Sequence, residues 1–396
     1  MSAPSASLRI FIIHASHHLT NHAPSGDGLV AWGYIAELAR MGHRIHAVTD
    51  KLDVLGEVPP NLTLIEFPRR CANPVLHYVR YMAMIRALYR RIAMTEGIDV
   101  VHQMNPVVRG LSLALAGCKV PIVLGTYVGD WKWLRSAPTY RARTFKERIA
   151  AALKTSLDAW QQHYAAALAL ATPNALSRVP LRSARGDRIA FLHHGVDTAL
   201  FTPEPQVDDP ARRPLAILFV GSIRYYKGAA TLVDAFKRVA LEVPEAKLVF
   251  VGSGLSAEMA QRLANDGLAH RAEFVGPSSR SEVAGWLRAC SVLCAPSFGE
   301  PYGQNVLEAM ATGMPVVATS EGGHPYLVDA RGGYCVAPGD ANALASALIE
   351  VLRDAPRAQR MGAHNRAIVE RRNAWPLVTI DLERIYRGAI ARPSAG

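Results

Sequence analysis

The stretch 291–318, S-V-L-C-A-P-S-F-G-E-P-Y-G-Q-N-V-L-E-A-M-A-T-G-M-P-V-V-A, constrains the fold of this chain more than any other. The apolar run 291–296 predicts a short buried strand, and a turn rich in glycine and proline follows it. We expect a helix over 304–312, closed by Gly313 in the left-handed conformation, and a second buried strand over 314–318. Such a strand–loop–helix–strand unit is typical of an open parallel sheet, which binds ligands at the carboxyl ends of its strands.

Two acids lie in this unit with seven residues between them: Glu300 in the loop, and Glu308 a little over one turn into the helix. Between them, the first amides of the helix near Gly303 lack helical partners and favour an anion. A nucleotide-sugar needs carboxylates for its sugar and ribose hydroxyls and a cradle for its diphosphate. The alternative is that Glu300 caps the turn and Glu308 is a solvated helix residue.

The string E-P-Y-G-Q-N-V-L-E-A-M-A-T-G-M-P-V-V-A resembles the signature of the retaining glycosyltransferases of family 4. The resemblance implies an α/β chain of the GT-B fold, with two facing Rossmann-like domains, a deep cleft between them and a C-terminal helix that crosses back to the first domain. It also implies that Glu300 contacts the donor sugar near the reacting carbon and that Glu308 holds the ribose. Four residues between these acids are expected to bind the donor as well: Tyr302, Gly303, Gln304 and Asn305.

A second donor-binding loop, G-S-I-R-Y-Y-K-G, follows the strand expected over 215–220. It resembles the family pattern G-R, four residues, K-G, whose Arg and Lys clamp the donor diphosphate. Lys227 matches the Lys, whereas Ser222 stands at the Arg position and Arg224, two residues on, could reach the same phosphates. We therefore expect Lys227 and Arg224 to neutralise the leaving diphosphate. The alternative is a surface turn with a solvated lysine.

Three further segments resemble donor-site loops of the family. Gly252 begins a second glycine turn, G-S-G-L, and Val275 ends the strand that meets the nucleotide base through its backbone. The segment S-E-G-G-H-P-Y-L-V resembles G-G-x-P-E-x-V, with Tyr326 in place of the Glu. Gly322 and Gly323 still permit a tight turn there. None of these residues identifies the base.

The first half of the chain begins like a Rossmann-type domain, with a strand over 8–15, a polar loop, a helix from about 29 to 41 and a strand over 43–48. Gly26 and Gly28 before the helix, with Asp50 after the second strand, suggest the fingerprint of an NAD-dependent dehydrogenase. That fingerprint needs its glycines directly after the first strand, whereas about ten residues intervene here. The dehydrogenase is therefore a weak alternative.

By resemblance, this glycine loop approaches the donor diphosphate and the acceptor. We place Gly28 beside the donor, and Gly26 and Asp27 beside the acceptor. The same loop holds His14, His17, His18 and His22 without clear metal-ligand spacing, which favours structural or acceptor-contacting histidines over a metal site.

The segment I-D-V-V-H-Q-M-N-P resembles the family's D-V-V-H-x-H, with His102 at the first His and Met104 in place of the second. We expect a catalytic role for His102, with Asn105 at the acceptor; the alternative is that His102 is a core histidine. Asp130 follows the strand expected over 120–125, where a carboxylate could bind acceptor hydroxyls.

With 396 residues, the chain is long enough for two cores. We expect an acceptor-binding domain over 1–200 and a nucleotide-sugar-binding domain over 215–375. The Pro-rich, charged stretch 201–214 is the expected linker. A helix within 376–396 is expected to pack on the first domain.

The net charge of +11 is concentrated in residues 1–200, which hold 23 Lys and Arg against 13 Asp and Glu. Basic residues interleaved with aromatics occupy 69–91 and 132–154. Such a face suits an anionic membrane surface or an acidic acceptor, or it is simply solvated; no nucleic-acid motif accompanies it. Neither a membrane-spanning run nor an export signal is evident, and the five cysteines form no framework. We expect a cytoplasmic protein that could bind the inner membrane surface peripherally.

These features together predict a retaining glycosyltransferase. It would move a hexose-type sugar from a UDP- or GDP-sugar to a hydroxyl of a glycan, lipid-linked or small-molecule acceptor. We expect no cofactor and no metal requirement, because Lys, Arg and a helix dipole can replace a divalent cation. The alternatives are a nucleotide-sugar epimerase of the same fold, the dehydrogenase, and a basic non-catalytic binding protein.

Overall fold

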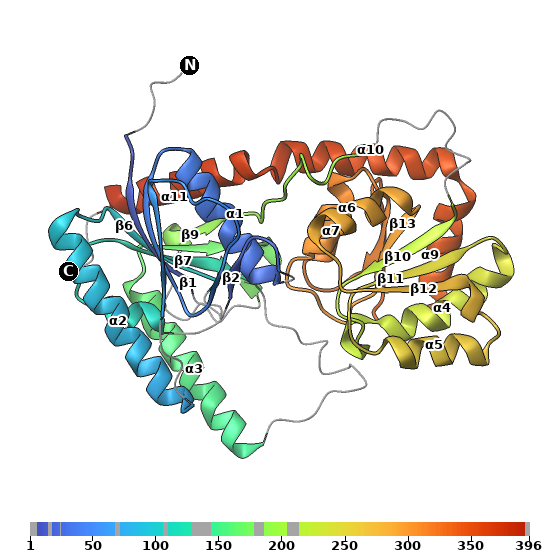
Figure 1. The fold of residues 1–396 in the computed structure, drawn as a ribbon, viewed down its shortest axis with the longest axis horizontal. Helices are drawn as coiled ribbons and strands as arrows, with labels where there is room; N and C mark the ends of the chain where they lie inside the picture. The colour runs from blue at the N-terminus through green and yellow to red at the C-terminus, as the bar shows by residue number, and fades with distance from the viewer. Residues whose placement is uncertain are drawn as a thin grey trace. The chain divides into compact units, whose positions relative to one another are not determined.

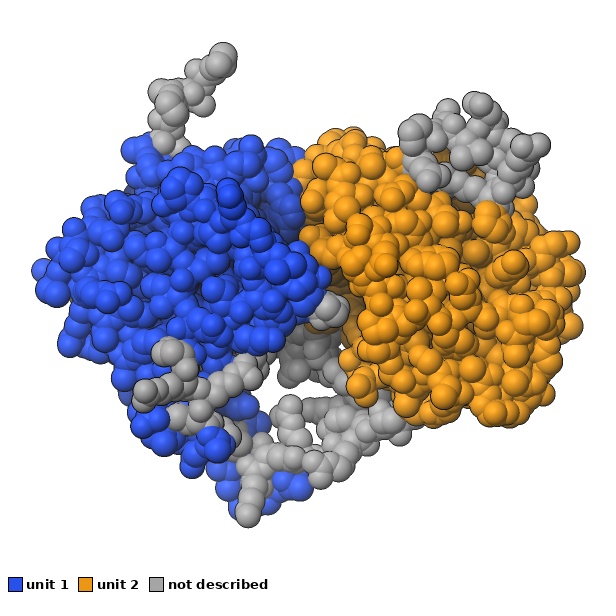
Figure 2. All heavy atoms as spheres, in the orientation of Figure 1, with its two compact units in different colours: residues 1–129, 143–195, 375–396 blue, residues 130–142, 196–374 orange. Residues whose placement is uncertain are grey.

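The structure is a computed structural model that divides the chain into two compact units (Figure 2). Unit 1 comprises residues 1–129, 143–195 and 375–396, and unit 2 comprises residues 130–142 and 196–374. The structure describes residues 6–14, 18–23, 25–67, 72–105, 110–128, 144–177, 186–203 and 214–392. Most of the predicted linker lies outside the described residues. The cleft that the resemblance implies between the domains stays a prediction.

Unit 1 is built on a seven-stranded parallel sheet of order β5-β3-β1-β6-β7-β8-β9 (Figure 1). Parallel neighbours require crossover connections, which helices provide here. The strands are β1 (Arg9–His14), β3 (Arg44–Thr49), β5 (Leu62–Glu66), β6 (Val100–Met104), β7 (Ile122–Tyr127), β8 (Ala167–Leu170) and β9 (Ile189–Phe191). The helices are α1 (Gly26–Arg40), α2 (Pro74–Thr95), α3 (Phe145–Tyr164) and α11 (Trp375–Ala391), with the short 3₁₀ helix η1 (Leu111–Leu115).

The two faces of this sheet carry separate cores. Because side chains alternate along a strand, Ile10 and Ile12 of β1 pack with α1 and α11, whereas Phe11 and Ile13 pack with α2 and η1. All four side chains are essentially inaccessible to solvent. Burial on both faces explains why the strands of this sheet are nearly continuous apolar runs in the sequence.

Unit 2 holds a six-stranded parallel sheet of order β12-β11-β10-β13-β14-β15. Its strands are β10 (Ala216–Val220), β11 (Lys247–Val251), β12 (Ala272–Gly276), β13 (Val292–Ala295), β14 (Val316–Thr319) and β15 (Gly333–Val336). Its helices are α4 (Ala229–Glu242), α5 (Ser256–Asn265), α6 (Arg280–Ala289), α7 (Gln304–Ala311), α8 (His324–Leu327), α9 (Ala341–Arg353) and α10 (Ala355–Arg372), with the 3₁₀ helix η6 (Tyr225–Lys227). The stretch 291–318 forms β13, α7 and β14 as predicted, and Gly313 is left-handed at φ +69°.

Two local expectations for the first half of the chain were wrong. The helix predicted from about residue 29 begins at Gly26, because Ser25 caps it with its Oγ 3.3 Å from the Gly28 amide and Asp27 favours its first turn. The polar loop before it contains β2 (Leu19–Thr20), which pairs in parallel with β4 (Leu52–Asp53). Two-residue strands leave no periodic pattern for the sequence to reveal.

No described helix is both long enough and apolar enough to cross a bilayer.

Trp375 holds the last helix in unit 1. An added Cβ would stand 2.0 Å from the Trp375 ring at Gly33 of α1, and 2.2 Å from it at Gly195. The ring therefore lies directly on two backbone segments, and it also meets the ring of Tyr34 edge-on at 5.1 Å. Glycine at these positions lets α11 pack closely against α1.

The Trp375 contact predicts opposite effects of two glycine-to-alanine substitutions within helices. Gly33→Ala should destabilise unit 1 by about 1–3 kcal/mol, because the added methyl group would overlap the indole. Gly388→Ala in α11 is the matched control: it meets nothing within 4 Å and should be neutral or stabilising by up to about 1 kcal/mol. Thermal unfolding followed by circular dichroism would measure both. Equal effects of the two variants would contradict this packing.

Candidate functional site

The loops at the carboxyl ends of β10, β11, β13 and β14 converge through close backbone contacts. An added Cβ at Gly228 would stand 1.9 Å from the Pro296 carbonyl oxygen, and one at Gly252 would stand 2.0 Å from that of Gly221. At Gly322 it would stand 2.1 Å from the Glu300 carbonyl oxygen. All three glycines also have positive φ, so other residues would be strained there as well. The convergence places the predicted donor loops of unit 2 next to one another.

Lys227 and Glu300 form an ion pair between two of these loops, joining Lys227 Nζ and Glu300 Oε2. The side chains are 23% and 13% exposed, so the pair is partly sheltered but remains open to a ligand. The loops are also joined by a 2.9 Å hydrogen bond from the Phe298 amide to the Tyr226 carbonyl oxygen. The solvated-lysine alternative for Lys227 does not fit this arrangement.

Helix α7 begins beside this pair. Gly303 precedes it at φ +97° and offers no side-chain cap, while the Val306 amide in the first turn donates to Asn305 Oδ1 at 2.9 Å. Asn305 instead donates from Nδ2 to the Val220 carbonyl oxygen at 3.0 Å, which fixes the start of α7 against the end of β10. The first amides of a helix carry partial positive charge and attract anions. The site can therefore hold a phosphate next to a lysine.

Glu308 is buried, so the alternative of a solvated helix residue was wrong. It is 8% exposed within α7, and burial raises the pKa of its carboxyl group to about 7. Arg280 opposes this shift: its Nη2 lies 3.9 Å from Glu308 Oε1, and its guanidinium stacks on Phe201 at 5.3 Å. Near neutral pH the carboxyl group can both donate and accept hydrogen bonds, which suits a pair of hydroxyls.

His324 is a residue of this site that the sequence did not single out. It is fully buried, and an added Cβ at Gly303 would stand 2.8 Å from its Cδ2. Thr319 Oγ1 donates to the Ser297 carbonyl oxygen at 2.6 Å and lies 3.3 Å from His324 Nδ1, so that ring nitrogen carries the proton. Nε2 has no partner among the described residues. Burial lowers the pKa of His324 to about 4, so the ring is neutral.

The remaining residues predicted in unit 2 differ in accessibility. Arg224 is exposed at the start of η6, and Ser222 is half-buried with its Oγ 3.5 Å from Tyr226 Oη. Val275 is half-buried near the end of β12. The Tyr302 hydroxyl lies inside unit 2, where it accepts from Asn373 Nδ2 at 2.9 Å. Gln304 is half-buried as the first residue of α7.

In unit 1, three predicted site residues lie in the first turn of α1: Gly26 and Asp27, predicted at the acceptor, and Gly28, predicted at the donor. An added Cβ at Gly28 would stand 2.2 Å from the carbonyl oxygen of His18, the residue before β2, so the start of α1 packs closely against this segment. Asn105 joins this turn by donating from Nδ2 to the Asp27 carbonyl oxygen at 3.0 Å, and it adopts φ +44°. Gly26 is exposed, and an added Cβ there would meet no atom within 4 Å. Asp130 lies outside the described residues.

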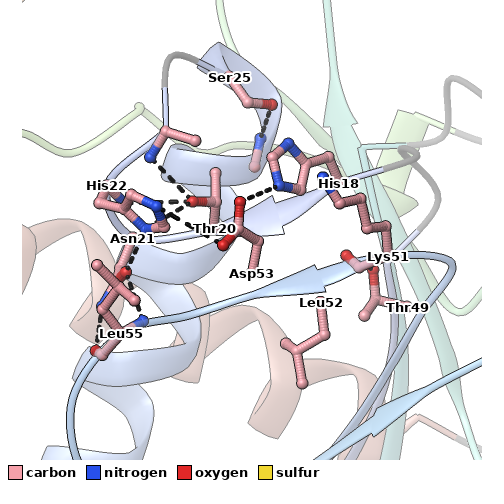
Figure 3. A network of polar contacts seen from close by, with 12 residues as sticks. His18, Thr20, Asn21, His22, Ser25, Thr49, Lys51, Leu52, Asp53 and Leu55 are labelled. Carbon is pink, nitrogen blue, oxygen red and sulfur yellow. Dashed lines mark hydrogen bonds and ion pairs between the residues drawn. The ribbon is translucent and has the colours of Figure 1, made fainter. Parts of the chain in front are cut away.

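A polar network fixes the segment before α1 (Figure 3). His18 Nε2 lies 3.0 Å from Asp53 Oδ2, and His22 Nε2 lies 3.6 Å from Asp53 Oδ1. Thr20 accepts from the amides of His22 and Ala23 at 3.2 and 3.0 Å. These two histidines are therefore structural in this segment. Within the ranges that the structure describes, no three His, Cys, Asp or Glu side chains are grouped so that they could hold a metal.

His102 occupies the core position that the sequence left open as an alternative to catalysis. It is 1% exposed, with Nε2 3.0 Å from the Gly125 carbonyl oxygen and Nδ1 2.6 Å from the hydroxyl of Tyr386 in α11. Since a carbonyl only accepts, Nε2 donates and Nδ1 accepts from Tyr386. Burial lowers the His102 pKa to about 4. Both ring nitrogens are engaged, which favours the structural role.

Asp50 does not fit the dehydrogenase fingerprint. It is 7% exposed, and its Oδ1 lies 3.0 Å from His77 Nε2 of α2. In a dinucleotide site this acid would instead have to face the ribose of the cofactor.

Comparisons with known proteins indicate the family of this chain. The model of the family described as "Glycosyl transferases group 1" matches residues 203–367. The chain is 26% identical to phosphatidyl-myo-inositol mannosyltransferase of Mycobacterium leprae, over 90% of this chain and 93% of that protein. It is 30% identical to D-inositol 3-phosphate glycosyltransferase of Xylanimonas cellulosilytica, over 75% of this chain and 68% of that one.

Solved structures share the fold. The crystal structure of Anabaena HepE in complex with UDP superposes with a TM-score of 0.71 and 17% identity, covering 95% of this chain and 99% of that chain. The likeness confirms the GT-B class that the sequence resemblance implied, here seen as two parallel-sheet units.

The burial of Glu308 predicts a specific pH dependence of stability. In the native protein the Glu308 carboxyl group has a pKa of about 7, whereas in the unfolded chain its pKa is near 4.5. Between these pH values the unfolded state binds fewer protons, so the free energy of unfolding should fall as the pH rises, by up to about 3 kcal/mol from this group. The Glu308→Gln variant should lack this component. Urea unfolding of both proteins across this range measures the difference; a constant difference would contradict the assigned burial.

Proposed function

The chain belongs to the glycosyl transferases of group 1 and is a glycosyltransferase, and from this premise we propose that it transfers a hexose-type sugar from a nucleoside diphosphate sugar to an acceptor hydroxyl, with retention of configuration. The observation that carries the proposal is the Lys227–Glu300 ion pair beside the N-terminus of α7. The Lys227 ammonium group, the Glu300 carboxylate and the N-terminal end of α7, which attracts anions, lie next to one another. A nucleotide-sugar presents diphosphate and sugar hydroxyls side by side, which these groups complement.

Lys227 and the start of α7 would stabilise the leaving diphosphate. As the bond between the sugar carbon and the phosphate oxygen breaks, negative charge grows on the diphosphate, and preorganised cations and amides stabilise that charge. Arg224, exposed at the start of η6, can add a second cation. In this arrangement protein cations and a helix end do the work that a divalent ion does elsewhere, so we propose that transfer is metal-independent.

The two acids of the site have different tasks in this proposal. Glu300 already holds Lys227, so it would fix both the lysine and a sugar hydroxyl next to the reacting carbon. Glu308, buried with a pKa near 7, would bind the two ribose hydroxyls as donor and acceptor. The acceptor oxygen forms the new bond to the sugar carbon, the nucleoside diphosphate departs, and the hydroxyl proton is released with it.

For the acceptor, we propose a compound that carries inositol phosphate, either free or linked to a lipid. The support is that the two relatives are named for phosphatidyl-myo-inositol and D-inositol 3-phosphate. UDP and GDP remain the two candidate donor nucleotides, and HepE was crystallised with UDP. The relatives are named as transferases, which gives the epimerase alternative no support. The buried thiols Cys290 and Cys294 fit a reducing, cytoplasmic location.

Replacing Glu300 tests the transfer step. Glu300→Gln should lower kcat on the order of 100-fold, because the amide cannot hold the sugar and Lys227 as the carboxylate does. The affinity for the nucleoside diphosphate should change little, since Lys227 and the start of α7, the groups proposed to bind the diphosphate, are retained in this variant. Glu350→Gln is the matched control, because Glu350 pairs with Arg357 in an exposed ion pair of the same unit. Steady-state kinetics and calorimetric titration would separate the two effects, and full activity in Glu300→Gln would refute the role.

The donor nucleotide can be identified by thermal shift. We expect stabilisation by one of UDP and GDP, since a ligand at 100 times its dissociation constant adds about 2.7 kcal/mol to a protein that binds it only when folded. Lys227→Met should abolish the shift, and Lys237→Met, which removes an exposed lysine paired with Asp266, should not. A shift with NAD and none with any nucleoside diphosphate would sink the proposal.

A further inference from the structure

Helix α3 of unit 1 has a polar inner face. Asp158, Gln161 and Gln162 are each at most 1% exposed. Asp158 accepts three hydrogen bonds, from the Tyr127 hydroxyl at 3.1 Å, from Gln161 Nε2 at 2.8 Å and from Gln162 Nε2 at 3.1 Å. Gln161 Oε1 in turn accepts from the Gly110 amide at 2.7 Å. Hydrogen bonds therefore attach this part of the helix to the rest of unit 1, where an apolar stripe would be usual.

The outer face of α3 carries large apolar side chains instead, with the exposed Ser156 and His163 among them. Five large side chains on it are between 51% and 76% exposed: Phe145, Ile149, Leu153, Trp160 and Tyr164. At 100° per residue they fall within an arc of roughly 100° on one side of the helix. We call these five residues the outer stripe. Single exposed apolar residues are ordinary on a protein surface, but several large ones gathered on one helix face mark a surface that is covered in function.

The neighbouring helix α2 extends this surface. An added Cβ at Gly110 would stand 2.9 Å from Tyr78 Oη of α2 and 3.2 Å from Leu157 Cβ of α3, so the two helices flank the same point. Figure 1 shows both helices on one side of unit 1. Close to Tyr78, Val75 and Val79 are 71% and 55% exposed. Large exposed apolar side chains therefore lie on both of these neighbouring helices.

The charges around the outer stripe are positive. Arg148 and Lys154 of α3 are exposed, as is Arg80 of α2, close to Tyr78. The sequence of α2 contains no acid, and the acid of α3 whose side chain is described, Asp158, is buried. Two copies of this surface would bring like charges together, which opposes pairing with a second chain. An anionic surface would complement it.

We propose that the outer stripe of α3, with the adjacent end of α2, docks on an anionic lipid bilayer. The apolar side chains enter the boundary between headgroups and acyl chains, and the flanking Arg and Lys contact lipid phosphates. Trp160 and Tyr164 suit that boundary, because each has an apolar ring and a polar group. The helix lies on the membrane and does not cross it. This contact goes beyond the proposed transfer and does not depend on which sugar or acceptor is used.

Vesicle sedimentation tests the docking directly. The full chain should bind vesicles of phosphatidylcholine mixed with phosphatidylglycerol, bind pure phosphatidylcholine vesicles far less, and be released by high salt. Leu153→Ser should weaken binding to the mixed vesicles by about tenfold, because it removes a central apolar side chain from the stripe. Leu241→Ser is the matched control, since Leu241 is 83% exposed on α4 of unit 2 and should bind like the wild type.

Both leucines are exposed, so neither serine variant should unfold, and the midpoints of thermal unfolding would verify this. Wild-type protein that ignores the anionic vesicles, or Leu153→Ser protein that binds them fully, would overturn the proposal. So would a dimer in solution that Leu153→Ser converts to a monomer, because the stripe would then serve a second copy. Vesicle binding needs no donor sugar, so its failure is distinguishable from failure of the proposed transfer.

Discussion

The close approach of backbones in unit 2 is the constraint on which the site depends. Gly228 and Gly322 lie against carbonyl oxygens of the loop that follows β13, and neither position has room for a side chain. This contact sets the distance between loops that come from strands far apart in the sequence. Lys227 and Glu300, 73 residues apart, pair because their loops have already been brought together by glycine. The electrostatics of the site are thus a consequence of steric fit.

The carboxyl groups of Glu300 and Glu308, both between β13 and β14, lie in different environments. Glu300 faces a lysine and is partly open to solvent, so its charge is balanced locally. Glu308 is buried with an arginine at 3.9 Å, and loss of solvation outweighs the attraction, which raises its pKa. Two residues of the same type can therefore have different chemical roles because their surroundings differ.

The sequence predicted the fold and the central unit well because both depend on local patterns. The boundaries of β13, α7 and β14 follow from apolar runs and from Gly303 and Gly313, which adopt the left-handed conformation that other residues rarely take. The burial of Glu308, by contrast, depends on the residues that pack around α7. The apolar periodicity of the sequence alone did not predict that burial. His324 went unnoticed for a similar reason, because its importance comes from Gly303 and Thr319 packed around it. His102 matched a motif, yet its partner Tyr386 lies 284 residues away, beyond any local signal.

The packing of Trp375 has a consequence for how this protein is made. Unit 1 takes its last helix from the C-terminal end of the chain, after unit 2 is complete in the sequence. Until residues 375–391 have left the ribosome, the surfaces of Gly33 and Gly195 that receive Trp375, and the side of His102 that faces Tyr386, stay uncovered. The domain that is synthesised first is therefore the one that finishes folding last. A nascent chain stalled before α11 would hold a completed unit 2 and an open core in unit 1.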